Sequence, residues 1–384
     1  MAPYVNPDNT PLTSWDLTVG QIINMDEVVY MLDPDDLPLT AGIGIDGNAL
    51  LPKTGVDQVV FSWLDDEMLL PRSQLGAAAT TGDTIITVQS NHRAKFSTGD
   101  VIRVVQGTKD EVMRVTGYSA TTAEDILVSR AFAGTATNYA SGSTVLVLGQ
   151  ALSEGSDPEN ARNSERTENS NVLQIFGPTA VKMSRTKQQV RRYGIGNEFN
   201  HQLMQRMREN RIMVEQALLY GAKVYNTSTD LRTMGGLLNF LTTNTDATST
   251  QLTVTTIQTN QETCYNAGGV PNVLVCNPTS LDDLNAISDT GRVRVEFADS
   301  RRGRVPVTVV TTEFGDMLIA RNRWCENVHA FGIRTEQVVR RILQPLIYEQ
   351  LAKTGDSRHG QIVAEESVEV KGEEHMFLME ALSY

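Results

Sequence analysis

The sequence has few cysteines, few histidines and no long apolar run, and each shortage excludes a class of protein. Its 384 residues include only Cys264, Cys276 and Cys325, without CxxC spacing, so we expect three packed thiols rather than disulfides or a zinc knuckle. Apolar runs such as Val145–Leu148 fall far short of the about 20 residues that span a bilayer, so no membrane segment is expected. The five histidines form no HxH or HxxxH pattern, so we predict no metal and no other cofactor.

Positive charge is also in short supply. Lys and Arg number 33 against 46 Asp and Glu, which gives a formal net charge of −13. This balance argues against a general nucleic-acid-binding protein, because neutralising phosphates requires a surplus of Lys and Arg. Residues 1–18 lack the basic patch and apolar core of a secretory signal, so the chain is expected to stay in the compartment that made it.

The first part of the chain predicts an arm followed by a loop. Residues 1–50 contain five prolines and several acidic pairs, which favours an extended arm with little core of its own. Residues 51–75 hold an apolar, strand-like stretch at Val56–Leu64. The acidic group Asp65, Asp66 and Glu67 follows it, and we interpret this region as the start of a hairpin-like loop.

Residues 76–149 differ in composition from their surroundings. They are rich in Thr, Val, Ile and Gly, and turn signals such as Thr81-Gly82-Asp83 separate short β patterns. The five patterns are Thr84–Val88, Val101–Val105, Glu111–Val115, Asp125–Ser129 and Thr144–Leu148. Short strands with evenly spaced turns are typical of a small closed β-barrel, so we predict an inserted domain here.

A long helix is predicted over residues 197–224. Asn197 can cap its first turn, and apolar residues from Phe199 to Leu218 recur at steps of four and seven. At 1.5 Å per residue such a helix is roughly 40 Å long and acts as a spine. Its other faces carry Arg206, Arg208, Arg211 and Glu215, which form either a solvated face or a contact with a neighbouring subunit or DNA.

The C-terminal half predicts a mixed α/β region. Asn272–Cys276 has the pattern of a buried strand, and Asn277 with Pro278 begins a predicted helix that ends near Gly291. Residues 338–351 are predicted to be helical. Further strands are predicted at Val305–Thr311, Met317–Ala320 and Val328–Ile333, with a closing hairpin of Ile362–Val370 and His375–Leu382. The fold class is therefore α+β.

Two motifs suggest chemistry but lack its context. Gly42–Gly47 matches GxGxxG, yet no strand precedes it and no amphipathic helix follows, so we interpret it as a loop. Ser184-Arg185-Thr186-Lys187, Ser288-Asp289-Thr290 and Lys353-Thr354-Gly355 have the order of a serine acyl-transfer motif set. The neighbouring residues predict a strand, which would place Ser184 and Lys187 on opposite faces. We therefore predict no catalytic residues and no enzyme.

The order of these segments, together with several local motifs, carries a family resemblance. The motifs are Asp36–Leu39, Trp63–Leu69, Asn171–Phe176, Tyr193–Glu198, Ile362–Glu366 and, most specific, Glu349–Asp356. Over nearly the whole chain the sequence resembles the major capsid (major head) proteins of tailed double-stranded DNA bacteriophages. It is most similar to a subfamily with a small β-barrel inserted in the extended loop.

The resemblance implies a five-part fold and a structural function. The parts are an N-terminal arm (1–50), an extended loop (51–75 and 150–180), the inserted β-barrel domain (76–149), a peripheral domain with the spine helix (181–234 and 331–384) and an axial domain (235–330). The implied function is a virion subunit that assembles into hexamers and pentamers of an icosahedral shell around packaged double-stranded DNA. Implied partners are a separate scaffolding protein, a portal, a decoration protein where one exists, and DNA through non-specific contact, with assembly in the host cytoplasm.

The residues themselves suggest where copies of the chain could meet. We hypothesise that Trp63, Asp65, Asp66 and Glu67 lie on the extended loop. Their acidic group would meet basic residues of a neighbour, with Arg191, Arg192, Arg206, Arg208 and Arg211 as candidates. Two alternatives stay open at this point, which are a bacterial shell of the same fold that encloses a protein cargo and, less favoured, the serine acyl-transfer enzyme.

Overall fold

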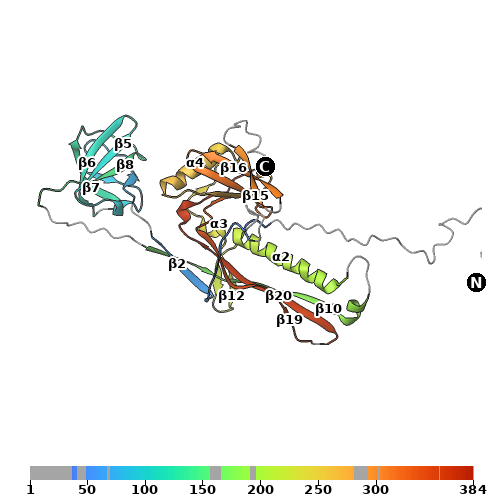
Figure 1. Cartoon of the computed structure of the whole chain (residues 1–384). Coiled ribbons are helices and arrows are strands. Elements are labelled where there is room, and N and C mark those ends of the chain that lie inside the picture. Colours follow the sequence, from blue (N-terminus) through green and yellow to red (C-terminus); the bar gives the residue numbers. More distant parts are fainter. Residues whose placement is uncertain are drawn as a thin grey trace, which may run out of the picture. The chain divides into compact units, whose positions relative to one another are not determined.

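The computed structural model describes residues 37–40, 49–66, 70–120, 122–155, 166–190, 196–280, 293–300, 303–353 and 355–383. The chain divides into two compact units (Figure 1). The main unit comprises Met1–Trp63 and Ser170–Tyr384, and the inserted unit comprises Leu64–Asn169. Among the helices in the described ranges, none is both long enough and apolar enough to cross a membrane.

The inserted unit is built on one six-stranded antiparallel sheet in the order β3-β8-β5-β6-β7-β4. The strands are β3 (Arg72–Gln74), β4 (Ile85–Thr87), β5 (Asp100–Gln106), β6 (Lys109–Tyr118), β7 (Asp125–Ala133) and β8 (Thr144–Gln150), with a 3-10 turn η1 (Arg93–Lys95). A bridge between Leu75 and Val88 joins the two edge strands, so the sheet closes on itself. All five predicted β patterns are strands.

Apolar residues fill the interior of this closed sheet, and one buried ion pair lies beside them. Phe96, Ile102 and Met113 are fully buried there. Arg130 on β7 donates to Glu111 on β6, whose side chain is also fully buried, and Ala131 and Thr137 donate backbone N–H groups to the same carboxylate at 2.8 and 3.1 Å. Burial alone would raise the pKa of Glu111, but these hydrogen bonds outweigh it and hold the pKa below its usual value.

The main unit contains two sheets, and the first has the order β1-β19-β20-β10. Its strands are β1 (Lys53–Gly55), β10 (Gln174–Ser184), β19 (Val338–Gln350) and β20 (Ser357–Val370). Only β1 is parallel to its neighbour, whereas β19, β20 and β10 are antiparallel. The long helix α2 (Glu198–Tyr220) runs beside these long strands, and a short helix α1 (Arg185–Gln189) follows β10 (Figure 1).

Helix α2 begins where the sequence predicts and ends earlier. The side chain of Asn197 accepts a hydrogen bond from the N–H of Asn200 at 3.2 Å, as expected for an N-cap. The helix has 23 residues, or about 34 Å at 1.5 Å per residue. It stops before Gly221 because Gly236 donates to the Gly221 carbonyl at 2.7 Å, and a Cβ on Gly221 would lie 2.6 Å from the Met234 oxygen. A two-stranded ribbon of β11 (Val224–Asn226) and β12 (Leu231–Thr233) replaces the predicted last turn.

The second sheet of the main unit has seven strands in the order β13-β21-β18-β14-β17-β16-β15. They are β13 (Thr245–Asp246), β14 (Val273–Cys276), β15 (Val293–Ser300), β16 (Gly303–Thr312), β17 (Gly315–Arg321), β18 (Ala330–Ile333) and β21 (Phe377–Met379). Every residue of β14 is buried, as its apolar pattern predicts. Two helices, α3 (Leu237–Phe240) and α4 (Val254–Asn266), and a 3-10 turn η2 (Glu373–His375) complete this region.

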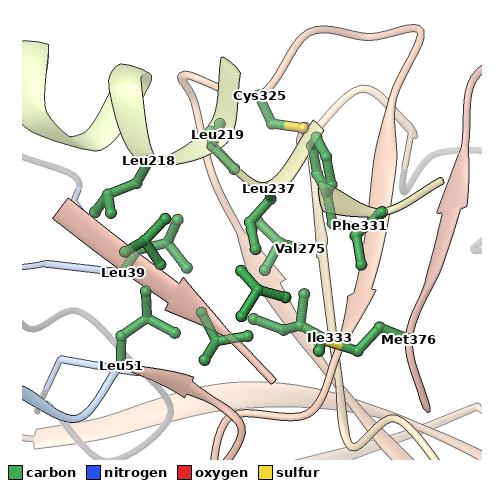
Figure 2. Close-up of a cluster of buried hydrophobic side chains, with 14 of the residues drawn as sticks. Leu39, Leu51, Leu218, Leu219, Leu237, Val275, Cys325, Phe331, Ile333 and Met376 are labelled. Atoms are coloured by element: carbon green, nitrogen blue, oxygen red, sulfur yellow. The ribbon is translucent and has the colours of Figure 1, made fainter. Parts of the chain in front are cut away.

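A shared apolar core joins the C-terminal part of α2 to both sheets. Figure 2 shows Leu218 and Leu219 of α2 near Leu237 of α3, with Phe331 and Ile333 of β18 in the same cluster. Leu39 and Leu51, which flank the predicted arm and loop boundary, belong to this cluster and are almost completely buried. At about 25 cal/mol per Å² of apolar surface removed from water, such burial fixes these two segments on the main unit.

Two predictions for the C-terminal part are wrong. Residues 338–351 form strand β19 rather than a helix, because Pro345 opposes a helix and the pairing with β20 satisfies the backbone. Residues 362–370 and 375–382 do not form a hairpin. Strand β20 pairs with β19 and β10, whereas β21 pairs with β18 and β13, so the chain changes sheets at Lys371–Met376.

Several predictions concern residues outside the described ranges. These are residues 1–36 of the predicted arm, the Gly42–Gly47 motif, the part of the predicted helix after Ser280, Ser288, Glu67, Arg191 and Arg192.

Candidate assembly surface

The structure places Trp63 in the interior of the main unit. It lies on β2 (Val60–Asp66), which pairs with β9 (Arg166–Val172), and only 5% of the Trp63 surface is exposed. Its ring centroid is 5.9 Å from that of Phe61 and 5.6 Å from that of Phe240. Trp63 therefore packs within its own chain, and any contribution to assembly would be indirect.

The two described acidic residues of the hypothesised contact already have partners in the inserted unit. Asp65 accepts a hydrogen bond from Asn169 Nδ2 at 2.8 Å, and Asp66 forms a 3.4 Å ion pair with Arg166. Both members of the ion pair are about half exposed or more, and exposed ion pairs contribute about 0–1 kcal/mol. The Asp66 carboxylate could therefore change partners at little cost.

The three candidate arginines of α2 do not form one stripe. At about 100° per residue, Arg208 and Arg211 lie about 60° apart around the helix, whereas Arg206 lies about 140–160° from them. Arg206 pairs with Glu209 one turn further along. Arg211 is exposed, and no acidic partner is found for it in the part of the chain that the structure describes. Arg208 and Arg211 are thus the pair that one neighbour could contact together.

Glu215, which the sequence placed with these arginines on an outer face, is fully buried. Its Oε1 accepts hydrogen bonds from the Leu39 N–H and from Asn322 Nδ2, both at 2.9 Å. Burial raises the pKa of Glu215 above its usual value, although the Leu39 hydrogen bond opposes this. Arg340 makes the next contact with this segment. Its Nη1 donates to the Thr40 carbonyl at 2.9 Å, and its guanidinium also pairs with buried Glu366.

These contacts form an arm anchor, consisting of Leu39, Thr40, Glu215, Asn322 and Arg340. A carboxylate and a guanidinium, on different elements, hold two successive backbone groups of the segment before β1. This anchor is not evident in the sequence, because its parts are far apart in the chain: Leu39 is 176 residues from Glu215.

The position of Ser184 differs from its prediction. It is the last residue of β10 and the N-cap of α1, and its hydroxyl accepts a hydrogen bond from the Lys187 N–H at 3.3 Å. Lys187 therefore lies on a helix, and the prediction that a strand separates the two side chains is wrong. The Ser184 hydroxyl serves as a helix cap in this structure.

The three cysteines are free and buried, as predicted. Burial raises the pKa of the Cys264 and Cys325 thiols to about 12 and also raises that of Cys276. Thiols with raised pKa values carry little thiolate near neutral pH, so they are poor nucleophiles and poor metal ligands. Within the described ranges, no group of three or more His, Cys, Asp or Glu side chains is placed to hold a metal ion.

Comparison with known proteins agrees with this architecture. The family model of the SU10 major capsid protein matches residues 6–383. A chain in a structure of Microbacterium phage Oxtober96 is 11% identical, with 97% of this chain and 99% of that chain covered and a TM-score of 0.50. The capsid of Myoviridae phage XM1 gives 10% identity, coverage of 94% and 100%, and a TM-score of 0.49.

An encapsulin complex from Synechococcus elongatus is 12% identical, covers 58% of this chain and 77% of its own, and has a TM-score of 0.36. No curated protein sequence matches. At these identities the solved structures are similar in fold alone, whereas the family model extends over almost every described element. The chain belongs to the SU10 major capsid protein family.

Proposed function

We propose that this chain, a structural subunit of a virion capsid, assembles into the hexamers and pentamers of an icosahedral shell that encloses packaged double-stranded DNA. The observation that carries the proposal is the family match over residues 6–383. The two-stranded β2–β9 strip, most of whose residues are exposed or half-buried, supports it, because extended segments with little core of their own are suited to contacts with other copies.

The proposed partners are a separate scaffolding protein, a portal and, where one exists, a decoration protein, with assembly in the host cytoplasm. The proposed DNA contact is non-specific. A net charge of −13 supports it, because a strongly basic inner wall would bind phosphates and hinder packaging.

For the contact between copies, we propose that Asp65, Asp66 and Glu67 of one copy meet arginines of a neighbour. Arg208 and Arg211 are the best-placed described candidates, and Arg191, Arg192 and Arg206 are the others from the sequence. Each such exposed pair contributes little alone. Many copies of a weak contact in a closed shell add up to a stable assembly.

The shell itself is tested by negative-stain electron microscopy of the purified chain, expressed alone and with a candidate scaffold. Closed shells or hexameric rings are expected, and nuclease-protected DNA in particles from infected cells would identify the contents. A strictly monomeric particle under both conditions would contradict the proposal.

The contact is tested by charge exchange. The D65K/D66K and R208E/R211E variants should each lose assembly, and the D65K/D66K/R208E/R211E variant, in which every copy carries both exchanges, should regain it. Lys109→Glu, an exposed charge reversal on β6 of the inserted unit and outside the β2–β9 strip, serves as the control and should assemble normally. Full assembly of either double variant alone would refute this contact.

A further inference from the structure

One end of the first sheet of the main unit carries a concentration of positive charge. Strand register places Lys182 opposite His359 and Met183 opposite Arg358 where β10 meets β20. Arg185 and Lys187 follow on α1, and Lys353 lies between β19 and β20. We define the basic tip as Lys182, Arg185, Lys187, Lys353, Arg358 and His359.

The charge of this tip is opposite to that of the chain. Residues 180–190 and 349–359 contain five Lys and Arg but only two acidic residues, Glu349 and Asp356. Asp356 is engaged by Arg185 at 3.1 Å, and Glu349 accepts a hydrogen bond from Gln361 at 2.9 Å. Within the described ranges no ion pair is found for the exposed side chains of Lys182, Lys187 and Lys353, although Glu198 lines another hollow together with Lys182 and Lys187. Several unneutralised cations held close together favour an anion between them.

A hollow at the tip has the size and the donors for such an anion. A 230 Å³ cavity is lined by Arg185, Lys353, Ser357, Arg358 and His359, among others. The Ser357 hydroxyl is hydrogen-bonded to His359 Nε2. Guanidinium, ammonium, hydroxyl and imidazole groups are the donors that bind carboxylate and phosphate oxygens.

The Arg358 side chain is fixed by contacts within its own chain, as is expected of a residue that binds a ligand. Its guanidinium carbon lies 4.2 Å from the centre of the Phe199 ring, and its Nη2 donates to Gln350 Oε1 at 3.4 Å. Its Nε–H is buried and has no acceptor among the described residues. A fixed guanidinium loses little conformational entropy when it binds, and an unsatisfied N–H gains a hydrogen bond.

We propose that the basic tip is an oxyanion-binding site and that in the shell it takes a side-chain carboxylate of a second copy of this chain. The choice of a second copy as the source of the carboxylate rests on the proposed shell function. Every neighbour in such a shell is an acidic chain of net charge −13, so it offers carboxylates at high local concentration. Duplex DNA fits less well, because a duplex presents its phosphates along a broad backbone whereas the hollow is small.

The site is tested with inorganic phosphate as the probe and calorimetry on the unassembled full-length chain. The wild type should bind one phosphate per chain with saturation, and R185Q/K353Q should bind at least tenfold more weakly. K53Q/R323Q removes the same charge from two other exposed positions of the main unit and should bind like the wild type. Circular dichroism and thermal melting check that both variants fold. Absence of saturable binding, or an equal loss in the control variant, would overturn the proposal.

The source of the anion is tested on assembled shells. If a carboxylate of a second copy fills the site, shells should no longer bind phosphate at the tip, and R185Q/K353Q should need at least tenfold more protein to assemble than K53Q/R323Q. Shells that still take one phosphate per chain, or double-stranded DNA oligonucleotides bound only by chains with an intact tip, would refute the second-copy carboxylate. A wild-type chain that binds phosphate but never assembles would instead contradict the proposed shell function.

Discussion

Removing the Glu215 side chain should be among the most destabilising single changes in the main unit. Glu215→Ala leaves the N–H of Leu39 and the Nδ2 of Asn322 buried without their acceptor. Each unsatisfied buried donor costs about 1–3 kcal/mol, so the expected loss in the free energy of unfolding is about 2–6 kcal/mol. That is a large share of the about 5–15 kcal/mol that stabilises a typical domain.

Urea unfolding followed by tryptophan fluorescence measures this loss. Trp324 is a suitable reporter because its backbone N–H donates to Asn322 Oδ1 at 2.8 Å, next to the anchor. Glu215→Gln keeps one acceptor oxygen and should lose less than about 1.5 kcal/mol, the net value of a typical hydrogen bond. Gln216→Ala, an exposed neighbour on α2, is the control.

The reasoning would be refuted if Glu215→Ala were as stable as Gln216→Ala within about 0.5 kcal/mol, the usual range for a surface change. Arm release without global unfolding is a separate readout. Hydrogen exchange at Leu39 should accelerate in Glu215→Ala, because the N–H loses its buried acceptor.

Three further predictions follow from buried charges and unit boundaries. The pKa of Glu215 in the folded protein lies above the unfolded value of 4.5. Between these two pKa values the folded state binds more protons than the unfolded state. The contribution of Glu215 to stability should therefore fall as the pH rises from 4.5 through the folded pKa. Urea titrations at a series of pH values should show this fall in the free energy of unfolding in the wild type and not in Glu215→Gln. Arg130→Met should destabilise the inserted unit by about 3–5 kcal/mol in thermal melts, because Glu111 loses its buried partner, whereas the exposed Arg103→Met should cost less than about 1 kcal/mol. Replacing residues 72–150 with a short Gly/Ser linker should leave the main unit soluble with an unchanged melting temperature, and insolubility would contradict two independent cores.

The elements that the sequence predicted correctly are those whose evidence is local. Asn197 and the apolar spacing after it lie within one helix, and the turn signals of the inserted unit lie between adjacent strands. Strand β14 is an uninterrupted apolar run beside a turn signal. Cap, period and turn chemistry act over a few residues, so they can be recognised without knowing the partner.

The errors arise where a tertiary contact decides between local alternatives. The apolar residues of Val338–Gln350 suit either a helix face or a strand, and the pairing with β20 decides between them. The same limit hid Glu215, whose hydrogen-bond partner Asn322 is 107 residues away. A buried carboxylate on a helix surrounded by arginines has the sequence pattern of a solvated face until its partners are known.

The basic tip shows why a binding surface of this fold is hard to see in the sequence. Lys182 and Lys353 stand in separate segments: Lys182 begins a basic segment that continues through Arg185 and Lys187, whereas Lys353 looks like a single solvated lysine. Antiparallel pairing of β10 with β20 brings the two segments together, because Lys182 is opposite His359 only six residues after Lys353. Charge that is dispersed in the chain thereby becomes concentrated at one end of a sheet, in a protein whose total charge has the opposite sign. To find an assembly surface of this kind, the strand pairing must be known first. Only then can the charges that lie close together be counted.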